Sequence, residues 1–342
     1  MKSDTEPQDA QVLRSLITGY ETSQVIHVAA RLGVADLLAD EPQTATALAD
    51  KLRVDASALN RVLHALAALG LIEQLPEGRY ALTQSGTLLR DGVTGSLRGF
   101  ALLSGERSYR AWGGLLHSVK TGETAFRHVF GMDTFAYMAA NPEIAGFYNE
   151  AQTAGASERT AAVVAAYDFS AGGTVIDVGG GHGTLLIAIL AAYPGVRGVL
   201  FERESVAIGA REHIEAAGLG SRCAVQAGDF FESVPGEGGI YFLSHIVHNW
   251  DDQRCGKILA SCRASMPRAA RLLILEKVLP NRFDSARISV QAAMADLHML
   301  AITGGQERTV EEYKSLLAAG GFTLTNVIGT SVADSLIEAV PS

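Results

Sequence analysis

From Gly173 to the end of the chain, short apolar runs of the strand type alternate with segments of helical periodicity. GTVIDVG, RGVLFE and CAVQAGD are separated by TLLIAILAAY and ESVAIGAREHIEAAG, and GIYFLSHIVH and RLLILEKVL continue the pattern. Runs that are apolar on both faces and separated by helices predict a parallel sheet covered on both sides. FTLTNVIGT and SLIEAV have no helix between them and predict an antiparallel hairpin at the sheet edge. The C-terminal part is therefore predicted to be a doubly wound α/β domain, which binds nucleotide-like ligands at strand carboxyl ends.

Residues 10 to about 100 predict a mainly helical region instead. Residues 24–38 and the segment after a turn at 53–55 have apolar residues at helical spacing, and we expect Ser57 and Gly70 to cap the second of these helices. The β-prone pieces GLIEQ and RYALT flank a turn at 76–78. Helix, turn, helix and hairpin form the plan of a winged helix.

A winged helix often binds DNA, so its charge matters. Residues 44–90 carry five Lys or Arg and four Asp or Glu residues, and the whole chain has a net charge of −9. A DNA reader needs several cations for phosphates and polar tips for base edges. We therefore expect no nucleic-acid partner, and an apolar set of helices favours a subunit interface. A DNA-binding regulator remains the non-enzymatic alternative.

Three cysteines, Cys223, Cys255 and Cys262, form no CxxC pair, which argues against a disulfide framework and a thiolate zinc site. The first twenty residues lack the apolar core of a signal peptide, and no run of about 18 apolar residues predicts a membrane span. We expect a cytoplasmic protein with no membrane partner. The expected domains are 1–100, helical; 101–165, connecting helices whose aromatic side chains mostly pack against one another and partly form an apolar substrate wall; and 166–342, the α/β domain.

The first strand of the α/β domain ends in the glycine turn DVGGGHG, and a helix is expected from about Thr184. Glycines at such a bend let a ligand approach the backbone, and helix N-terminal amides point into the same space. A dinucleotide fingerprint would place a third glycine or an alanine where Thr184 stands. Asp177 precedes the first glycine of the turn by two residues and suits a ligand that bears an ammonium group.

Two further acidic residues follow the next two strands. Glu202 can accept hydrogen bonds from both hydroxyls of a ribose, Asp229 can accept from an adenine amino group, and Phe230 can pack on the ring. The glycine turn contains no Lys or Arg, which argues against a phosphate-bearing cofactor. Together these residues favour a cationic nucleoside such as S-adenosylmethionine.

With these motifs, the chain resembles the class I S-adenosylmethionine-dependent O-methyltransferases of the group shared by plant phenolic and bacterial natural-product enzymes. The winged-helix region, DVGGGHG, LFERE, AGDFFESVP, HNWDD, LEKVLP and GGQERT carry the resemblance nearly from end to end. It implies that the N-terminal region forms a homodimer. It also implies cofactor contacts from Gly179, Gly181, Glu202, Asp229 and Phe230, and a further contact from Ser244, which stands where plant members usually have lysine.

The resemblance further implies that His248 is the general base, with Glu276 and Glu307 to orient it. A phenol titrates near ~10 and a histidine near ~6.5, so base assistance helps at neutral pH. A carboxylate on the far imidazole nitrogen fixes the tautomer and stabilises the imidazolium. For either glutamate alone, a surface or loop salt bridge is the alternative.

The stretch SHIVHNWDD also permits a metal site. If the strand GIYFLSHIVH runs through both histidines, their odd spacing sends His245 and His248 to opposite faces, where they cannot share a metal. Asp251 and Asp252 are expected to cap the following helix. We therefore expect no metal and a structural role for His245.

Met299 matches a family methionine that clamps the flat acceptor, and His298 beside it serves either the acceptor or the core. The expected activity is O-methylation of an aromatic or fused-ring secondary metabolite, with a phenazine hydroxyl as the first guess because VLFERESV, YFLSHIV and DLHMLA resemble that subgroup. N-methylation of a ring nitrogen, and decarboxylation or hydroxylation on the same scaffold, remain alternatives.

Overall fold

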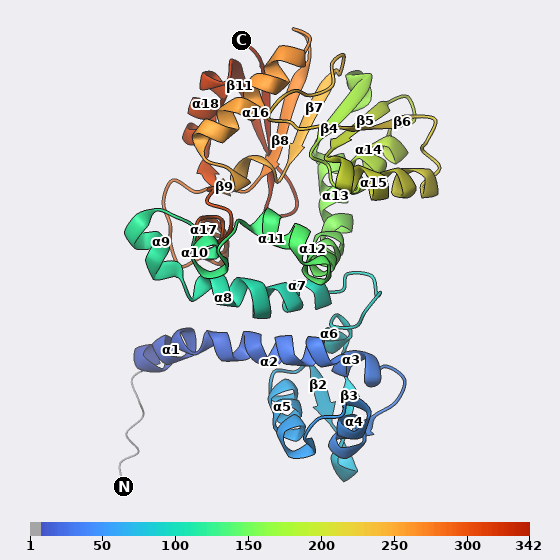
Figure 1. Cartoon of the computed structure of the whole chain (residues 1–342), viewed down its shortest axis with the longest axis vertical. Helices are drawn as coiled ribbons and strands as arrows, with labels where there is room; N and C mark the ends of the chain where they lie inside the picture. Colours follow the sequence, from blue (N-terminus) through green and yellow to red (C-terminus); the bar gives the residue numbers. More distant parts are fainter. Residues whose placement is uncertain (1–7) are drawn as a thin grey trace. The chain divides into compact units, whose positions relative to one another are not determined.

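The computed structural model describes residues 8–342 and divides them into two compact units (Figure 1). The first unit contains residues 8–113 and 135–155, and the second contains residues 114–134 and 156–342. The range 101–165 therefore contributes helices to both units. Among residues 8–342, no helix combines the length and the apolar character that a membrane span requires.

The first unit has the predicted order of helix, turn, helix and hairpin. Strand β3 pairs antiparallel with both β1 and β2, and the two longer helices of this region pack on the small sheet. The elements are α1 (Gln8–Ile17), α2 (Gly19–Leu32), α3 (Val34–Leu37), β1 (Gln43–Thr44), α4 (Ala45–Leu52), α5 (Ala56–Ala68), β2 (Ile72–Gln74), β3 (Arg79–Leu82) and α6 (Gln84–Thr87).

Three expectations about these helices are corrected. The helix expected over 24–38 breaks at Gly33, which adopts a left-handed φ of 70° between α2 and α3. Asp55, not Ser57, caps α5, because its carboxylate accepts the N–H of Ala58 at 2.7 Å. Gly70 lies one residue beyond the C-cap, with a left-handed φ of 73°.

The apolar set of N-terminal helices was expected to favour a subunit interface, but the apolar face of α5 is covered within this chain. Leu59, Leu63 and Leu66 are buried in the core of their own unit. The uncovered apolar face lies on α1 instead, which has no buried residue in this chain. Its exposed side chains include Leu16 and Ile17, which are 73% and 65% exposed.

The rest of the first unit is a packed pair of helical segments. Helix α7 (Arg98–Leu103) continues through a π-helical turn at Ser104–Ser108 into α8 (Tyr109–Trp112), and α12 (Pro142–Ala154) packs against α7. Arg98 and Glu150 join these helices by an ion pair at 3.0 Å. Helix α11 (Thr134–Ala140) precedes α12.

The second unit is built on a seven-stranded sheet of order β11-β12-β8-β7-β4-β5-β6 (Figure 1). The five strands from β8 to β6 are parallel, and β12 and β11 form the predicted antiparallel hairpin at one edge. The strands are β4 (Thr174–Val178), β5 (Arg197–Glu202), β6 (Cys223–Ala227), β7 (Ile240–Ser244), β8 (Arg271–Glu276), β11 (Phe322–Gly329) and β12 (Ser335–Pro341).

Helices cover both faces of this sheet, as the two-sided apolar runs predict. One core contains side chains of α16 (Asp252–Ser265) and α18 (Val310–Ala319), and the other contains side chains of α13 (Ala156–Ala166), α14 (Thr184–Ala192) and α15 (Glu204–Ala216). Helix α17 (Arg287–Ile302) packs against α9 (Leu115–Thr121) and α10 (Ala125–Phe130). The aromatic pair Phe126 and Phe130 stacks within α10 at 4.5 Å, in the packing role expected for most aromatics of this region.

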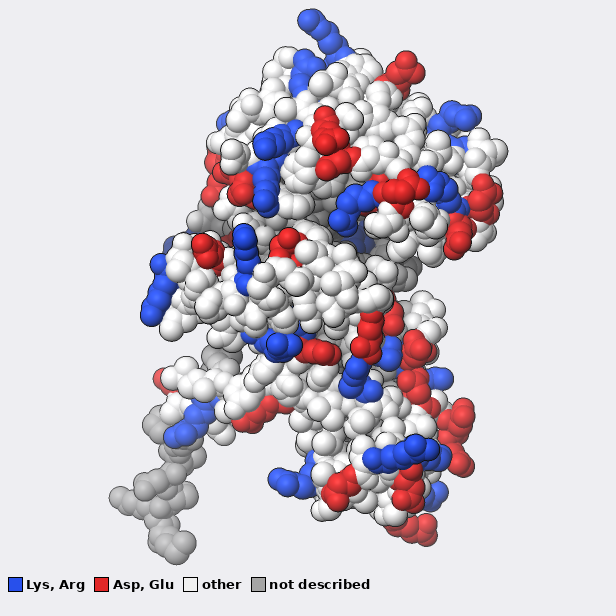
Figure 2. Space-filling view, viewed as in Figure 1, with Lys and Arg blue, Asp and Glu red and all other residues white. Residues whose placement is uncertain are grey.

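On the face drawn in Figure 2, Lys and Arg side chains are interspersed with Asp and Glu side chains. This mixture agrees with the balance of +1 over residues 44–90, and it is not the single-sign surface that attracts phosphates.

Candidate active site

The glycine turn lies at the carboxyl end of β4, and α14 begins at Thr184 as predicted. Gly179, Gly181 and Gly183 have φ values of 74°, 57° and 81°, a region that side chains rarely adopt. A Cβ on Gly179 would also come within 2.6 Å of the Ile246 side chain. The three glycines are therefore required for the bend, and Gly179 is also required for the close approach to the segment between β7 and His248.

Asp177 lies beneath this turn. Its side chain is only 2% exposed, and neither carboxylate oxygen has a hydrogen-bond partner. Burial, together with the charge of Glu202, raises the pKa of Asp177 to about 7. A buried carboxyl group without a partner next to a glycine turn is a group that a cationic ligand can stabilise.

Glu202 closes the same turn at the end of β5. One of its oxygens accepts the N–H of Gly181 at 3.2 Å, and the other accepts the N–H of Arg203 at 2.8 Å. Since a carboxylate oxygen has two lone pairs, both oxygens retain acceptor capacity. Asp229 is exposed just after β6, and Phe230 beside it contacts Phe231 and Trp250 edge-on or tilted. Six of the seven sequence-predicted cofactor positions therefore lie at the carboxyl ends of the neighbouring strands β4, β5 and β6, and the seventh, Ser244, is the last residue of β7.

The strand β7 ends at Ser244, before either histidine, so the argument from strand parity is wrong. His245 adopts a left-handed φ of 54°, and His248 lies in the short 3-10 turn Val247–Asn249. Their rings are 5.5 Å apart, but they have different partners. His245 contacts Asp334 through Nε2 at 3.3 Å and the Ser244 hydroxyl through Nδ1 at 3.2 Å, so the structural role expected for His245 is confirmed.

The two aspartates of SHIVHNWDD have different partners. Asp251 caps α16 as predicted, since its carboxylate accepts the N–H of Arg254 at 2.8 Å. Asp252 is the first residue of that helix, and it binds the Arg308 guanidinium at 2.7 Å. The expected capping role is therefore confirmed for Asp251 only.

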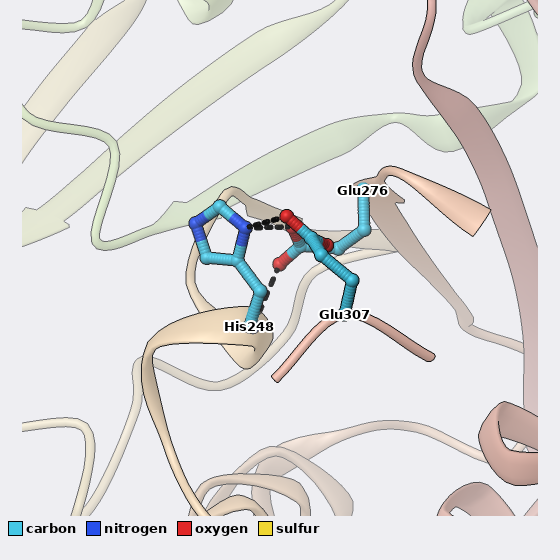
Figure 3. A group of neighbouring side chains, drawn as sticks. All are labelled: His248, Glu276 and Glu307. Carbon is cyan, nitrogen blue, oxygen red and sulfur yellow. Dashed lines mark hydrogen bonds and ion pairs between the residues drawn. The ribbon is translucent and has the colours of Figure 1, made fainter. Parts of the chain in front are cut away.

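Glu276 and Glu307 both reach the same nitrogen of His248 (Figure 3). Nδ1 lies 3.0 Å from Oε1 of Glu307, with hydrogen-bond geometry, and 3.0 Å from Oε2 of Glu276. Glu276 also accepts the backbone N–H of His248 at 3.2 Å. Two carboxylates on Nδ1 favour the tautomer with its proton there, which leaves the lone pair on Nε2, the nitrogen that Figure 3 shows pointing away from both carboxylates.

A short parallel pairing brings the two glutamates together. Strand β9 (Val278–Leu279) pairs with β10 (Arg308–Thr309), with Val278 opposite Arg308. Glu276 is the last residue of β8, just before β9, and Glu307 immediately precedes β10. The pairing thus places two residues that are distant in the sequence beside the same nitrogen of His248.

The electrostatics of this cluster follow from its burial. Glu276 is fully buried, Glu307 is 3% exposed and His248 is 8% exposed. Burial lowers the pKa of His248, but the charge of Glu276 and the hydrogen bond and charge of Glu307 outweigh it, so the pKa is raised above 6.5. Burial raises the pKa of Glu276, although His248 opposes this change. The cluster therefore stabilises a proton on the imidazole, which is what a general base requires.

The same three residues could hold a metal ion, because one ligand atom from each lies within 4.8 Å of the others. Imidazole nitrogen and carboxylate oxygen are ordinary ligands of zinc. In that arrangement the metal would replace the proton on Nδ1. Geometry alone therefore permits a proton or a metal between the imidazole and the glutamates.

The two residues predicted for the acceptor, His298 and Met299, are half-buried on α17. The Met299 carbonyl accepts the hydroxyl of Thr303 at 3.1 Å near the end of the helix. Asp296, on the same helix, accepts the N–H of Glu307 at 2.9 Å. Helix α17 is thereby joined directly to the strand segment that carries one of the two glutamates.

Sequence reasoning missed four polar residues around this site: Asp296, Arg308, Tyr313 and Asp334. Asp334 contacts Arg159, His245 and Lys277, and these partners lower its pKa against the opposing effect of burial. Tyr313 is fully buried, and burial raises the pKa of its hydroxyl well above 10. The QERT motif placed Arg308 beside Glu307, but its partners are set by tertiary contacts that a local pattern does not contain.

Comparison with known proteins places this site in a family. Residues 112–323 match the family model described as an O-methyltransferase domain, and residues 14–91 match that of an O-methyltransferase dimerisation domain. A phenazine O-methyltransferase of Lysobacter antibioticus is 45% identical over 332 residues, covering 97% of this chain and 96% of the relative. A phenazine-1-carboxylate N-methyltransferase of Pseudomonas aeruginosa is 31% identical, covering 96% of this chain and 97% of the relative.

Among solved structures, an O-methyltransferase from neocarzinostatin biosynthesis in complex with S-adenosylmethionine and 2-hydroxy-5-methyl naphthoic acid superposes with a TM-score of 0.83. It is 29% identical, and the match covers 94% of this chain and 96% of that chain.

Proposed function

The chain belongs to the O-methyltransferase family, and we propose that it methylates a hydroxyl group of a fused-ring aromatic compound, with a hydroxylated phenazine as the first acceptor to test. The observation that carries the proposal is the His248 ring, held at Nδ1 by two buried carboxylates at 3.0 Å. The phenazine O-methyltransferase relative supports the choice of acceptor. S-Adenosylmethionine is the cofactor, as in the solved relative that contains it.

The residues present fit this cofactor. The glycine turn has no room for a Cβ at Gly179, and Asp177 has two buried carboxylate oxygens without partners. We propose that these two residues, with Gly181, receive the methionine end. Glu202, Asp229, Phe230 and Ser244 would then hold the nucleoside end and its surroundings. When bound, the cofactor supplies an electrophilic methyl group.

The proposed chemistry needs alignment and removal of one proton. The acceptor oxygen forms a bond to the methyl group while the bond from that methyl to sulfur breaks, with the oxygen in line with that bond. The hydroxyl proton passes to Nε2 of His248, and Glu276 and Glu307 stabilise the imidazolium that forms. The proton then leaves to solvent, and the demethylated cofactor and the methyl ether are the products.

The test is methylation of an acceptor panel with deuterium-labelled S-adenosylmethionine. We expect mass spectrometry and NMR to find the labelled methyl on an oxygen of a hydroxylated phenazine, with lower turnover of single-ring phenols. Label on a ring nitrogen would instead establish the N-methylation that the Pseudomonas relative's name describes. Release of carbon dioxide or incorporation of oxygen without methyl transfer would support the decarboxylase or hydroxylase alternative.

Raising the pH should activate the enzyme. His248 acts as a base only when neutral, and its raised pKa keeps the imidazolium populated above pH 6.5. The logarithm of kcat/KM should therefore rise with a slope of one as the pH rises through the pKa of His248, and then level off. Because burial raises the pKa of Asp177 to about 7, cofactor affinity must be measured at each pH. A flat profile between pH 6 and 9 at constant cofactor saturation would contradict the assignment.

Removal of metal ions should leave turnover unchanged. We propose that a proton, and not a metal, lies between His248 and the two glutamates, because Nδ1 and Oε1 of Glu307 already have hydrogen-bond geometry. Dialysis against a chelator, followed by metal analysis of the active protein, checks this. A loss of activity that added zinc or magnesium restores would establish a metal enzyme.

The protein forms a homodimer, as its dimerisation domain indicates. For the domains, we propose dimerisation by residues 1–100, acceptor contacts from 101–165 and cofactor binding by 166–342. All three cysteines are free, which supports a reducing, cytoplasmic location as part of the proposal.

A further inference from the structure

We infer that Arg308 is a positioning residue for the general base, which ties the turn that carries His248 to the segment that carries Glu307. The inference rests on the proposed function, since it concerns the same imidazole. Arg308 directly follows Glu307, and at 1% exposure it is the largest fully buried side chain of the described residues. An arginine buried this deeply needs partners for its charge and its five N–H donors.

Those partners lie on both sides of His248 in the chain. The guanidinium donates to the carbonyls of Val247 and Trp250 at 3.4 and 3.1 Å, and it binds the Asp252 carboxylate at 2.7 Å. Its NH1 group also donates to the carbonyl of Gln306 at 3.2 Å. The backbone on both sides of the base is therefore held by the residue that follows Glu307.

Two further features hold the His248 turn close to its neighbours. The thiol of Cys255 donates to the carbonyls of Val247 and Trp250 at 3.2 and 3.4 Å, the same two that Arg308 binds. A Cβ on Gly305 would collide with the backbone of His248 and Asn249. At Gly305 the segment therefore packs backbone to backbone against the turn, and a side chain at this position would separate them.

This arrangement explains why Nδ1 of His248 can stay at 3.0 Å from Glu307. A lysine would supply one point charge and could not bind two carbonyls and a carboxylate in one plane. Without the guanidinium, the turn and Glu307 lose their shared anchor, and the hydrogen bond that stabilises the imidazolium lengthens. The glycine turn depends on β4 and β5, so cofactor binding should not change.

The test compares Arg308→Met with Arg222→Met. Arg222 is a matched control, because it also donates to several backbone carbonyls, those of Leu190, Pro194 and Val196, but it contacts none of the residues of the base. We expect Arg308→Met to lower kcat by about ten- to a hundred-fold, to move the rise of kcat/KM to lower pH, and to leave the Kd for S-adenosylhomocysteine unchanged. Arg308→Lys should recover only part of kcat. Arg222→Met should lower the melting temperature without moving the pH profile.

An NMR titration of the His248 ring, with S-adenosylhomocysteine bound, gives a readout that needs no turnover. The charged or titratable groups that face this ring are Glu276, Glu307, Lys277 and His245. Because Arg308→Met retains all four, a lower His248 pKa in this variant reports weakened contact with Glu307. This readout also separates the inference from the proposed function, since it stands even if no acceptor is turned over.

The inference is overturned if Arg308→Met behaves like Arg222→Met, with a lower melting temperature but an unchanged kcat and His248 pKa. If Arg308→Met does not fold, the His248 pKa of the variant Asp252→Ala tests the inference instead. Asp252 is 69% exposed on its side chain, so its loss should be tolerated. It should lower the His248 pKa in the same direction by a smaller amount, and an unchanged pKa overturns the inference.

Discussion

Replacing His248 with alanine is expected to lower kcat by about 10²- to 10⁴-fold. The expected cause is the loss of the group that we propose as acceptor of the hydroxyl proton, which the turn Val247–Asn249 places at the carboxyl edge of the sheet. Affinity for S-adenosylhomocysteine, measured by calorimetry, should stay the same because the glycine turn and Glu202 are untouched.

The pH dependence of this variant distinguishes a lost base from a damaged site. Once the acceptor ionises by itself, near pH ~10 for a simple phenol, no base is needed. The deficit of His248→Ala should therefore shrink as the pH approaches the pKa of the acceptor. His64→Ala serves as the control, because His64 is an exposed histidine of α5. Turnover within a few-fold of the unmodified protein would remove His248 from the mechanism.

Replacing both Glu276 and Glu307 with glutamine should lower kcat nearly as much as replacing His248 with alanine. A glutamine amide can donate to Nδ1, which would put the imidazole proton on Nε2, the nitrogen that must be free to accept. In the Ser-His-Asp triad, a comparable change costs about 10⁴-fold in kcat. Each single variant should lose less, because the other carboxylate remains 3.0 Å from Nδ1.

The double variant should also move the pH profile to lower pH, since both glutamates raise the pKa of His248 against the effect of burial. Glu338→Gln is the matched control. Glu338 is another buried glutamate of the same sheet, where it accepts from Tyr167 and Arg271 at 2.7 and 2.6 Å. It should lose stability but keep the pH profile. An unchanged profile in the double variant would show that the carboxylates do not act on the base.

Much of the fold follows from local patterns that the structure confirms. The runs that are apolar on both faces predicted the parallel strands, and the lack of a helix between FTLTNVIGT and SLIEAV predicted the edge hairpin of β11 and β12. The glycine turn predicted where α14 begins. The cap of α5 was misplaced by two residues because Asp55 and Ser57 are both good N-caps. The local sequence does not decide between two such neighbours.

The geometry of the base could not be predicted in the same way. The run GIYFLSHIVH reads as one strand, but the backbone leaves the sheet at Ser244 and His245 takes a left-handed conformation. Glu276 and Glu307 converge through two strands of two residues each, which are too short for any periodicity to reveal. Arg308 is fixed by carbonyl groups, and every sequence supplies these at every position. The family resemblance named His248 and both glutamates, whereas the contacts between them came from the structure.

The pairing of β9 with β10 also bears on how acceptor preference can change on this scaffold. It brings the two ends of the segment 280–307, which contains α17, to one point of the sheet edge. That segment begins directly after β9 and ends directly before β10, so their pairing fixes the positions of both of its ends. Exchanging residues 285–300 between relatives, with Asp296 kept as the acceptor of the Glu307 N–H, would replace Met299 and His298 while the His248 turn, Glu276 and the glycine turn stay in place. Such an exchange would therefore change the two residues predicted to contact the acceptor and keep His248, Glu276 and Glu307, the three residues proposed for removal of the proton.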